Sequence, residues 1–245
     1  MSFKSILGLA RLVFINFQVS LLTIFYASRN KLTREKANAI LQNWAHRLLK
    51  AARVDWHVHS PSSSIELISN QSYMLMCNHS SHFDIPLSIV AFPGLNVRMM
   101  AKKELFRIPF FGKAMRSAEF AIIDRGNIRQ GIQDLKQVEV LMQNGIVMWI
   151  APEGTRSKTG EIGNFKRGGF ITAIQAKAMI IPIGIVGSGN ILPAKSLNLN
   201  FGQRVDIYVG EPIDAGVYTL EQKDELIQKV KGVIEKLLQE KSEEN

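Results

Sequence analysis

Beyond residue 53, short β-rich runs alternate with segments of helical periodicity. Runs rich in β-branched and aromatic residues predict strands at 54–59, 73–77, 96–101, 120–123, 146–150, 179–186 and 205–209. Helical patterns lie between most of them, at 83–91, 104–117, 128–143, 168–176 and 220–239. Two strand signals without an intervening helix over 54–77 indicate a mixed sheet. We therefore predict an α/β domain over 54–245, with a mixed, largely parallel sheet flanked by helices.

The segment 6–27 is almost wholly apolar. On a helical wheel its polar residues Asn16, Ser20 and Thr23 gather away from one uninterrupted apolar arc, formed by Ile6, Leu7, Val13, Phe14, Phe17, Leu21, Ile24 and Phe25. The longest charge-free run, 12–28, would measure about 25 Å as a helix, slightly less than the roughly 30 Å hydrocarbon layer. Cations at both ends favour a helix that lies in an anionic interface. A spanning helix, a core helix and a signal peptide remain alternatives, although Tyr26-Ala27-Ser28 is a poor cleavage site.

A second helix is predicted from a cap at Thr33 to about Ala52. Its apolar residues repeat at the spacing of one helical stripe: Ile40, Leu41, Trp44, Ala45, Leu48, Leu49 and Ala52. With the first helix it would form an amphipathic two-helix hairpin over 1–53 that associates with a membrane. The alternative for this stripe is packing on the globular domain, and both can hold for different parts of it.

The positive charge is concentrated in the same segment. Residues 1–53 carry nine lysines and arginines against one acid, Glu35, and so supply +8 of the net charge of +9. A nucleic-acid-binding protein would place cations along its main binding surface, so no nucleic-acid partner is expected. The single cysteine, Cys77, excludes an intramolecular disulfide and a cysteine-rich zinc site, which favours the cytosolic side.

The stretch Asn78-His79-Ser80-Ser81-His82-Phe83-Asp84 spans the predicted strand end and the start of the next helix. A neutral His79 imidazole can take a proton from a hydroxyl if Asp84 holds its other nitrogen. His82 is a second candidate base. Three alternatives stay open: a structural His79–Asp84 hydrogen bond, a metal held by His79, His82 and Asp84, and covalent catalysis by Ser80, Ser81 or Cys77.

The stretch Pro152-Glu153-Gly154-Thr155-Arg156-Ser157 follows another predicted strand. Gly154 allows a positive φ and close approach of a substrate, and Arg156 can bind a phosphate bidentately. Further cations follow other strand ends, namely Lys102, Lys103 and Arg125. Any one of them is typical of a solvated surface, but because the carboxyl ends of parallel strands share one edge, together they predict a phosphate site beside His79.

Four blocks of sequence, in order over about 75–190, resemble the glycerolipid acyltransferase family, and within it the bacterial 1-acyl-glycerol-3-phosphate acyltransferases. The first is His79 with Asp84. The second joins Lys102-Lys103-Glu104-Leu105, Ile108-Pro109-Phe110-Phe111-Gly112 and Asp124-Arg125-Gly126. The third is Pro152 to Ser157, and the fourth is Ile181-Pro182-Ile183. Ala151 departs from the phenylalanine that this family often has.

The resemblance implies a mechanism and its site residues. His79, oriented by Asp84, would deprotonate the sn-2 hydroxyl of lysophosphatidic acid, which attacks the thioester of acyl carrier protein or coenzyme A to form phosphatidic acid. Arg125, Arg156 and Lys102 or Lys103 would hold the acceptor phosphate, with Glu153, Gly154 and Thr155 at the acceptor site. No metal, cofactor or acyl-enzyme is expected.

The resemblance also implies phospholipid biosynthesis at a membrane, on the cytoplasmic face of a bacterial inner membrane. Drawing a long acyl chain into water costs about 0.8 kcal/mol per methylene, so the enzyme should bring its site to the interface. Two other functions remain open. One is acyl transfer to another lysophospholipid or an aminolipid, and the other is non-catalytic membrane binding on the same scaffold.

Overall fold

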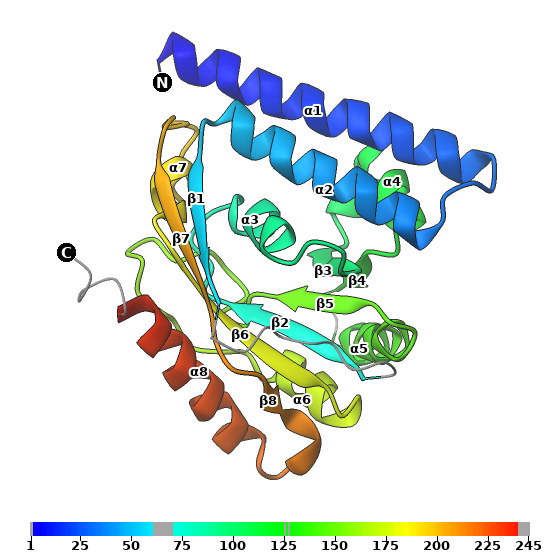
Figure 1. The fold of residues 1–245 in the computed structure, drawn as a ribbon. Coiled ribbons are helices and arrows are strands. Elements are labelled where there is room, and N and C mark those ends of the chain that lie inside the picture. The colour runs from blue at the N-terminus through cyan, green and yellow to red at the C-terminus, as the bar shows by residue number, and fades with distance from the viewer. Residues whose placement is uncertain (1, 61–70, 125, 127, 240–245) are drawn as a thin grey trace.

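A single mixed sheet organises the fold in the computed structural model, which describes residues 2–60, 71–124, 126 and 128–239 (Figure 1). Its strands run in the order β1-β7-β6-β2-β5-β3-β4, and β8 pairs with β6. Their bounds are β1 Asp55–His59, β2 Tyr73–Cys77, β3 Val97–Lys102, β4 Ala121–Ile123, β5 Val147–Ile150, β6 Met179–Val186, β7 Arg204–Val209 and β8 Ile213–Asp214. Neighbouring strands from β6 to β4 are parallel, as are β1 and β7, whereas β6 is antiparallel to β7 and β8. The predicted mixed, largely parallel sheet is therefore confirmed.

Helices cover both faces of the sheet. Their bounds are α1 Phe3–Ser28, α2 Arg34–Ala51, α3 Asp84–Ala91, α4 Phe111–Ser117, α5 Ile128–Gln143, α6 Arg167–Gln175, α7 Ser188–Ile191 and α8 Lys223–Gln239, with short 3-10 helices at Leu105–Arg107 and Ala215–Val217. Alternate residues of β2 divide the core: Leu75 and Cys77 pack with α1, α2 and α3, whereas Met74 and Met76 pack with α5, α6 and α8. This period-2 alternation is what a strand buried on both faces requires.

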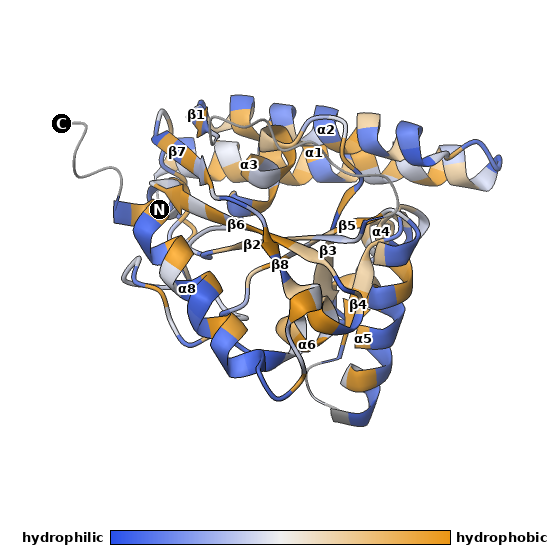
Figure 2. Cartoon of the chain, turned by 60° about the horizontal axis from the view of Figure 1, so that its bottom comes forward, coloured by the Kyte–Doolittle hydropathy of each residue, from blue (hydrophilic) through white to orange (hydrophobic). Residues whose placement is uncertain are grey.

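The predicted N-terminal hairpin is present, and its two helices differ in what they expose. Most of the apolar arc of α1 is exposed, including Leu7, Val13 and Phe14. In Figure 2 hydrophobic colour runs along α1, whereas α5 and α8 carry hydrophilic stretches. By length and composition, α1 is the helix among the described residues that could cross a membrane. The apolar stripe of α2 instead packs on the domain, as Ala45, Leu48 and Leu49 are buried in the core.

A polar junction fixes α2 to the domain. Arg34 forms an ion pair of 2.7 Å with Glu119. Arg98, almost fully buried, donates to Asn38 of α2 at 2.9 Å and to the Ala118 carbonyl oxygen. Burial lowers the pKa of Arg98 to about 10. The hairpin and the domain share a core and this junction, so the structure shows no boundary between them at residue 53. The division into 1–53 and 54–245 stays a sequence prediction.

The prediction of one helix over 104–117 was wrong. The segment contains the 3-10 turn Leu105–Arg107 and the separate helix α4. Pro109 lacks the N–H that a continuous helix needs and forces Ile108 into an extended conformation, with ψ at 123°. Phe110 then takes a positive φ of 60° and starts α4 in a new direction. The sequence patterns also did not predict α7, β8 or the turn Ala215–Val217.

Candidate active site

The first motif leaves the carboxyl end of β2, which is buried along its whole length. The Asn78 side chain accepts from the Ile185 N–H at 2.8 Å and donates to the Ile185 carbonyl oxygen at 2.9 Å. This two-way pairing fixes the motif to β6. Because β5 lies parallel to β2, the loop with the second motif leaves the same sheet edge.

His79 and Asp84 form the predicted pair. The His79 Nδ1 atom lies 2.7 Å from Asp84 Oδ2, and the same oxygen accepts the backbone N–H groups of Ser80 at 2.8 Å and Ser81 at 2.9 Å. The Asp84 side chain is fully buried in the first turn of α3, where the helix dipole favours a carboxylate. An ionised acceptor at Nδ1 assigns the ring proton to that nitrogen. Nε2, which bonds to no residue that the structure describes, is then available as a base.

An indole from the neighbouring strand supports this pair. The Trp149 ring on β5 meets the His79 imidazole edge-on, with centroids 5.9 Å apart. Its Nε1 donates to the Ser88 hydroxyl at 2.8 Å, and that hydroxyl donates to the Asp84 carbonyl oxygen at 2.8 Å. Trp149 and Ser88 therefore limit the movement of both partners. The sequence analysis missed them, although Ser88 lies one helical turn after Asp84.

Glu153 joins the two motif loops. Its buried carboxylate accepts the His79 backbone N–H at 3.0 Å through Oε1 and the Gly163 N–H at 2.8 Å through Oε2. The Ser157 N–H donates to the His79 carbonyl oxygen at 2.6 Å. Gly154 has the left-handed φ of 74° that the second motif requires. One carboxylate oxygen of Glu153 thus binds the backbone that carries His79, and the other binds the backbone at Gly163.

The cations predicted near the site have different surroundings. Three causes lower the pKa of His82: first partial burial of its ring, then the positive charge of the half-buried Arg156, and then His79. Arg156 therefore lies near His82. Lys103 is tied to Asp124 by an ion pair of 2.6 Å, and Lys102 is exposed at the end of β3. Thr155 is exposed beside Arg156. Arg125 lies outside the described residues.

Next to the first motif is a largely apolar cavity of about 370 Å³. Its walls come from α1, α2, α3 and the α4 region, and His82 and Phe83 belong to both the cavity and the motif. Leu12, Val19, Trp44, Leu48, Met99, Ala118 and Phe120 are among the other lining residues. The cavity was not predicted, because its lining comes from segments more than 100 residues apart in the sequence. Its apolar lining suits a hydrocarbon chain.

The site geometry speaks against the metal alternative and against two of the three candidate nucleophiles. Among the described residues no three histidines, cysteines, aspartates or glutamates gather to hold a metal, so His79, His82 and Asp84 form no ligand set. Cys77 is fully buried, and its burial raises the pKa of the thiol. Ser81 is equally buried and donates to the Leu192 carbonyl oxygen at 3.2 Å. Neither side chain can reach a substrate as a nucleophile.

Comparisons with known proteins give the family. A family model described as Acyltransferase matches residues 52–186, which is more than half of the chain. The chain is 31% identical over 179 residues to the 1-acyl-sn-glycerol-3-phosphate acyltransferase of Saccharomyces cerevisiae, covering 71% of this chain and 58% of the yeast protein. It is 30% identical over 145 residues to the chloroplastic 1-acyl-sn-glycerol-3-phosphate acyltransferase LPAT1 of Arabidopsis thaliana, covering 59% of this chain and 40% of that relative.

The fold has a counterpart among solved structures. The 1-acyl-sn-glycerophosphate acyltransferase of Thermotoga maritima superposes with a TM-score of 0.78 at 21% identity, covering 99% of each chain. This likeness extends through the two N-terminal helices. The family match and the fold agree with the resemblance seen in the four sequence blocks, and the chain belongs to the Acyltransferase family.

Proposed function

We propose that the chain transfers a fatty acyl group from the thioester of acyl carrier protein or coenzyme A to the sn-2 hydroxyl of 1-acyl-glycerol-3-phosphate, forming phosphatidic acid. The observation that carries this proposal is the 2.7 Å contact between His79 Nδ1 and a fully buried Asp84, beside a cavity suited to an acyl chain. The names of the yeast, Arabidopsis and Thermotoga relatives support the same acceptor.

In the proposed mechanism His79 acts as a general base. Its Nε2 takes the proton of the acceptor hydroxyl while the hydroxyl oxygen attacks the thioester carbonyl carbon. The tetrahedral intermediate collapses with cleavage of the C–S bond, and the imidazolium returns its proton to the departing thiolate. Asp84 stays ionised and stabilises the imidazolium, so the pair needs neither an acyl-enzyme nor a metal.

The proposed acceptor site combines a cation with an apolar wall. Arg156 would bind the phosphate bidentately, and Lys102 would add charge from the end of β3. Gly154 and Thr155 would line the acceptor loop, and Arg125 stays part of the proposal as a sequence prediction. The apolar cavity beside His82 would hold an acyl chain, whose transfer out of water is favourable by about 0.8 kcal/mol per methylene.

The proposal places the chain at a membrane, on the cytoplasmic face of a bacterial inner membrane. The exposed apolar arc of α1 supports association with lipid, and water-soluble thioester donors would approach from the aqueous side. Acyl carrier protein and coenzyme A are both anionic and both compatible with a basic chain.

A pair of neighbouring histidines tests the mechanism. The His79→Ala variant, purified in neutral detergent, should release thiol from acyl-coenzyme A and lysophosphatidate about 10²–10⁴ times more slowly than wild type. The matched control, His82→Ala, alters the same loop and one residue of the cavity lining but not the Asp84 partner, so the rate should fall by less than about tenfold. Near-normal turnover by His79→Ala, or equal losses in both variants, would refute the assignment.

A further inference from the structure

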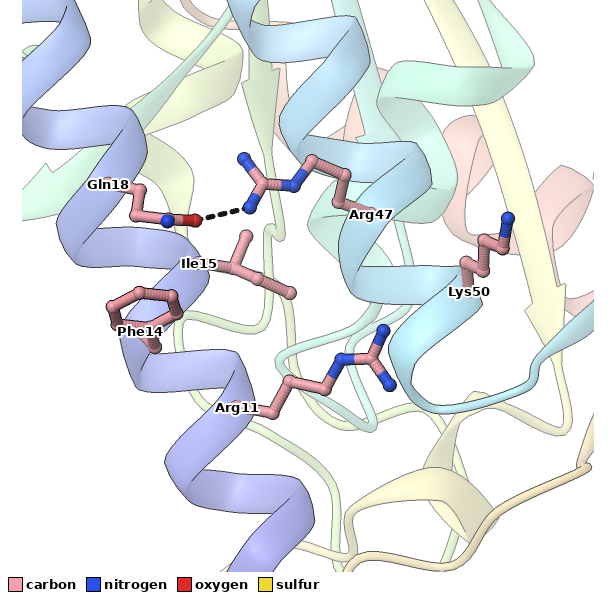
Figure 3. Close-up of a pocket in the computed structure, with 6 residues that line it drawn as sticks. All are labelled: Arg11, Phe14, Ile15, Gln18, Arg47 and Lys50. Carbon is pink, nitrogen blue, oxygen red and sulfur yellow. Dashed lines mark hydrogen bonds between the residues drawn. The ribbon is translucent and has the colours of Figure 1, made fainter.

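A second hollow lies on the outer side of the hairpin, away from the residues of the candidate active site. It measures about 340 Å³ and is lined by Arg11, Phe14, Ile15, Gln18, Arg47 and Lys50 (Figure 3). On α1 the four lining residues follow the i, i+3, i+4, i+7 spacing of one helical face, and Arg47 and Lys50 are three apart on α2. The groove is therefore a property of two facing helix surfaces, which we call the hairpin groove.

The cations of the hairpin groove lack acidic partners. Arg47 donates to the neutral Gln18 amide oxygen, and none of Arg11, Arg47 and Lys50 forms an ion pair with any residue that the structure describes. Glu35, the single acid of residues 1–53, lies at the other end of α2, about 18 Å along the helix from Arg47. Three positive charges thus line one hollow without compensation inside the protein.

The surroundings of these cations are apolar. Phe14 lines the groove and is 57% exposed. Leu7 and Leu21, one heptad before and after Phe14 on the same side of α1, are exposed as well. Unpaired cations between side chains that face lipid would be costly to desolvate without an anion. An anionic phospholipid has both parts that such a surface needs: a headgroup that carries the anion and acyl chains that can cover the apolar side chains.

We propose that the hairpin groove binds the headgroup phosphate of one anionic phospholipid from the bilayer. Arg11 and Arg47 supply donors for the phosphate oxygens, Lys50 supplies a third charge, and the acyl chains lie along Phe14 and its exposed neighbours. A lipid held between α1 and α2 fixes the rotation of α1 about its axis at the interface. The groove uses none of the residues assigned to acyl transfer, so this site stands or falls separately from the proposed reaction.

Two variants of equal charge test the site. The first is Arg11→Gln, Arg47→Gln and Lys50→Gln together. The control is Lys4→Gln, Arg29→Gln and Lys31→Gln together, on the same hairpin but outside the groove. Full-length proteins are bound to phosphatidylcholine vesicles with and without 20 mol% phosphatidylglycerol, a phosphodiester that is neither the proposed acceptor nor its product.

Both variants lose diffuse attraction to the anionic surface, about fivefold in affinity for each cation removed. The groove variant should bind the phosphatidylglycerol vesicles about tenfold more weakly still than the control, because charge-assisted hydrogen bonds to the phosphate are also lost. Equal losses in the two variants would show diffuse attraction only and overturn the site.

Native mass spectrometry gives an independent measurement. Wild type and the control should each retain one phosphatidylglycerol when released from mixed neutral detergent micelles, and the groove variant should retain none. Retention by all three, or by none, contradicts the proposal. Thiol release in neutral detergent should be unchanged in both variants, which separates failure of this lipid site from failure of the proposed acyl transfer.

Discussion

The two motif loops around His79 and the N-terminal hairpin place their charges in opposite ways. Around His79, the Asp84 and Glu153 carboxylates are buried, and the oxygens Asp84 Oδ2, Glu153 Oε1 and Glu153 Oε2 accept from defined donors. On α1 the large apolar side chains are exposed and the groove cations have no acidic partner among the described residues. Reacting groups must be held before the substrate arrives, whereas a membrane element leaves its apolar and cationic groups for lipid to satisfy.

The strongest test of the ordered region is Asp84→Asn. An amide removes the negative charge and no longer fixes the Nδ1 proton of His79, so the rate of thiol release should fall about 10³-fold or more, in line with triad aspartates elsewhere. The Ser88→Ala variant, which loses the hydrogen bonds to the Asp84 carbonyl oxygen and to Trp149 but keeps the carboxylate, should lose less than about tenfold. If Asp84→Asn keeps a tenth of the wild-type rate, the two motif loops are not the preorganised region described above.

Glu153 and Arg156 differ in how they should affect kinetics. In the wild type each carboxylate oxygen of Glu153 accepts a backbone N–H, but in Glu153→Gln one oxygen is replaced by an NH₂ group that cannot accept. The unpaired N–H costs about 1–3 kcal/mol, and we expect the loop to shift and displace His79. We expect kcat to fall about tenfold to hundredfold with little change in KM for lysophosphatidate. Arg156→Gln should instead raise that KM about tenfold and leave turnover of a phosphate-free monoacylglycerol unchanged. A rise in KM with normal kcat for Glu153→Gln would make it an acceptor-binding residue, as the resemblance implied.

The hairpin is tested by removing exposed apolar groups. Phe3→Ser with Leu7→Ser changes residues that are 74% and 55% exposed, and should weaken partition into neutral vesicles about tenfold. Activity in detergent should be retained. Ile132→Ser with Val140→Ser, both 55% exposed on α5, is the matched control and should leave partition unchanged. Equal effects of the two pairs would mean that α1 is not the membrane-binding face.

The smallest expected effect lies at the junction between the two regions. Hydrogen bonds from Arg34 hold the pKa of Glu119 below its usual value. A lowered folded-state pKa contributes stability above the unfolded value and loses it as pH falls through the folded value. Chemical denaturation of Glu119→Gln should therefore show a loss of less than about 1 kcal/mol at pH 7, given partial exposure of both side chains, and this loss should disappear as the pH falls through the lowered folded-state pKa. A loss that is constant with pH would exclude this ion pair as its cause.

Local sequence patterns reached much of the fold and the centre of the site. Period-2 and period-3.6 patterns found seven strands and the two N-terminal helices, because each depends on residues close in the chain. The five-residue spacing from His79 to Asp84 gave the pair that the structure brings to 2.7 Å. The break at Pro109 and Phe110 was missed because the apolar residues on both sides fit one helical period. Pro109 nevertheless separates the 3-10 turn Leu105–Arg107 from α4.

By itself the sequence determined the alternation of strands and helices, the apolar arc of α1 and the pairing of His79 with Asp84, since these follow from neighbours along the chain. Only the tertiary structure decided that Glu153 binds the backbone of His79 across 74 residues, that Lys103 pairs with Asp124, and that distant helices enclose the apolar cavity. The hairpin groove likewise exists only where α1 and α2 meet. Such features depend on long-range packing, which brings together side chains whose separation in sequence carries no local signal.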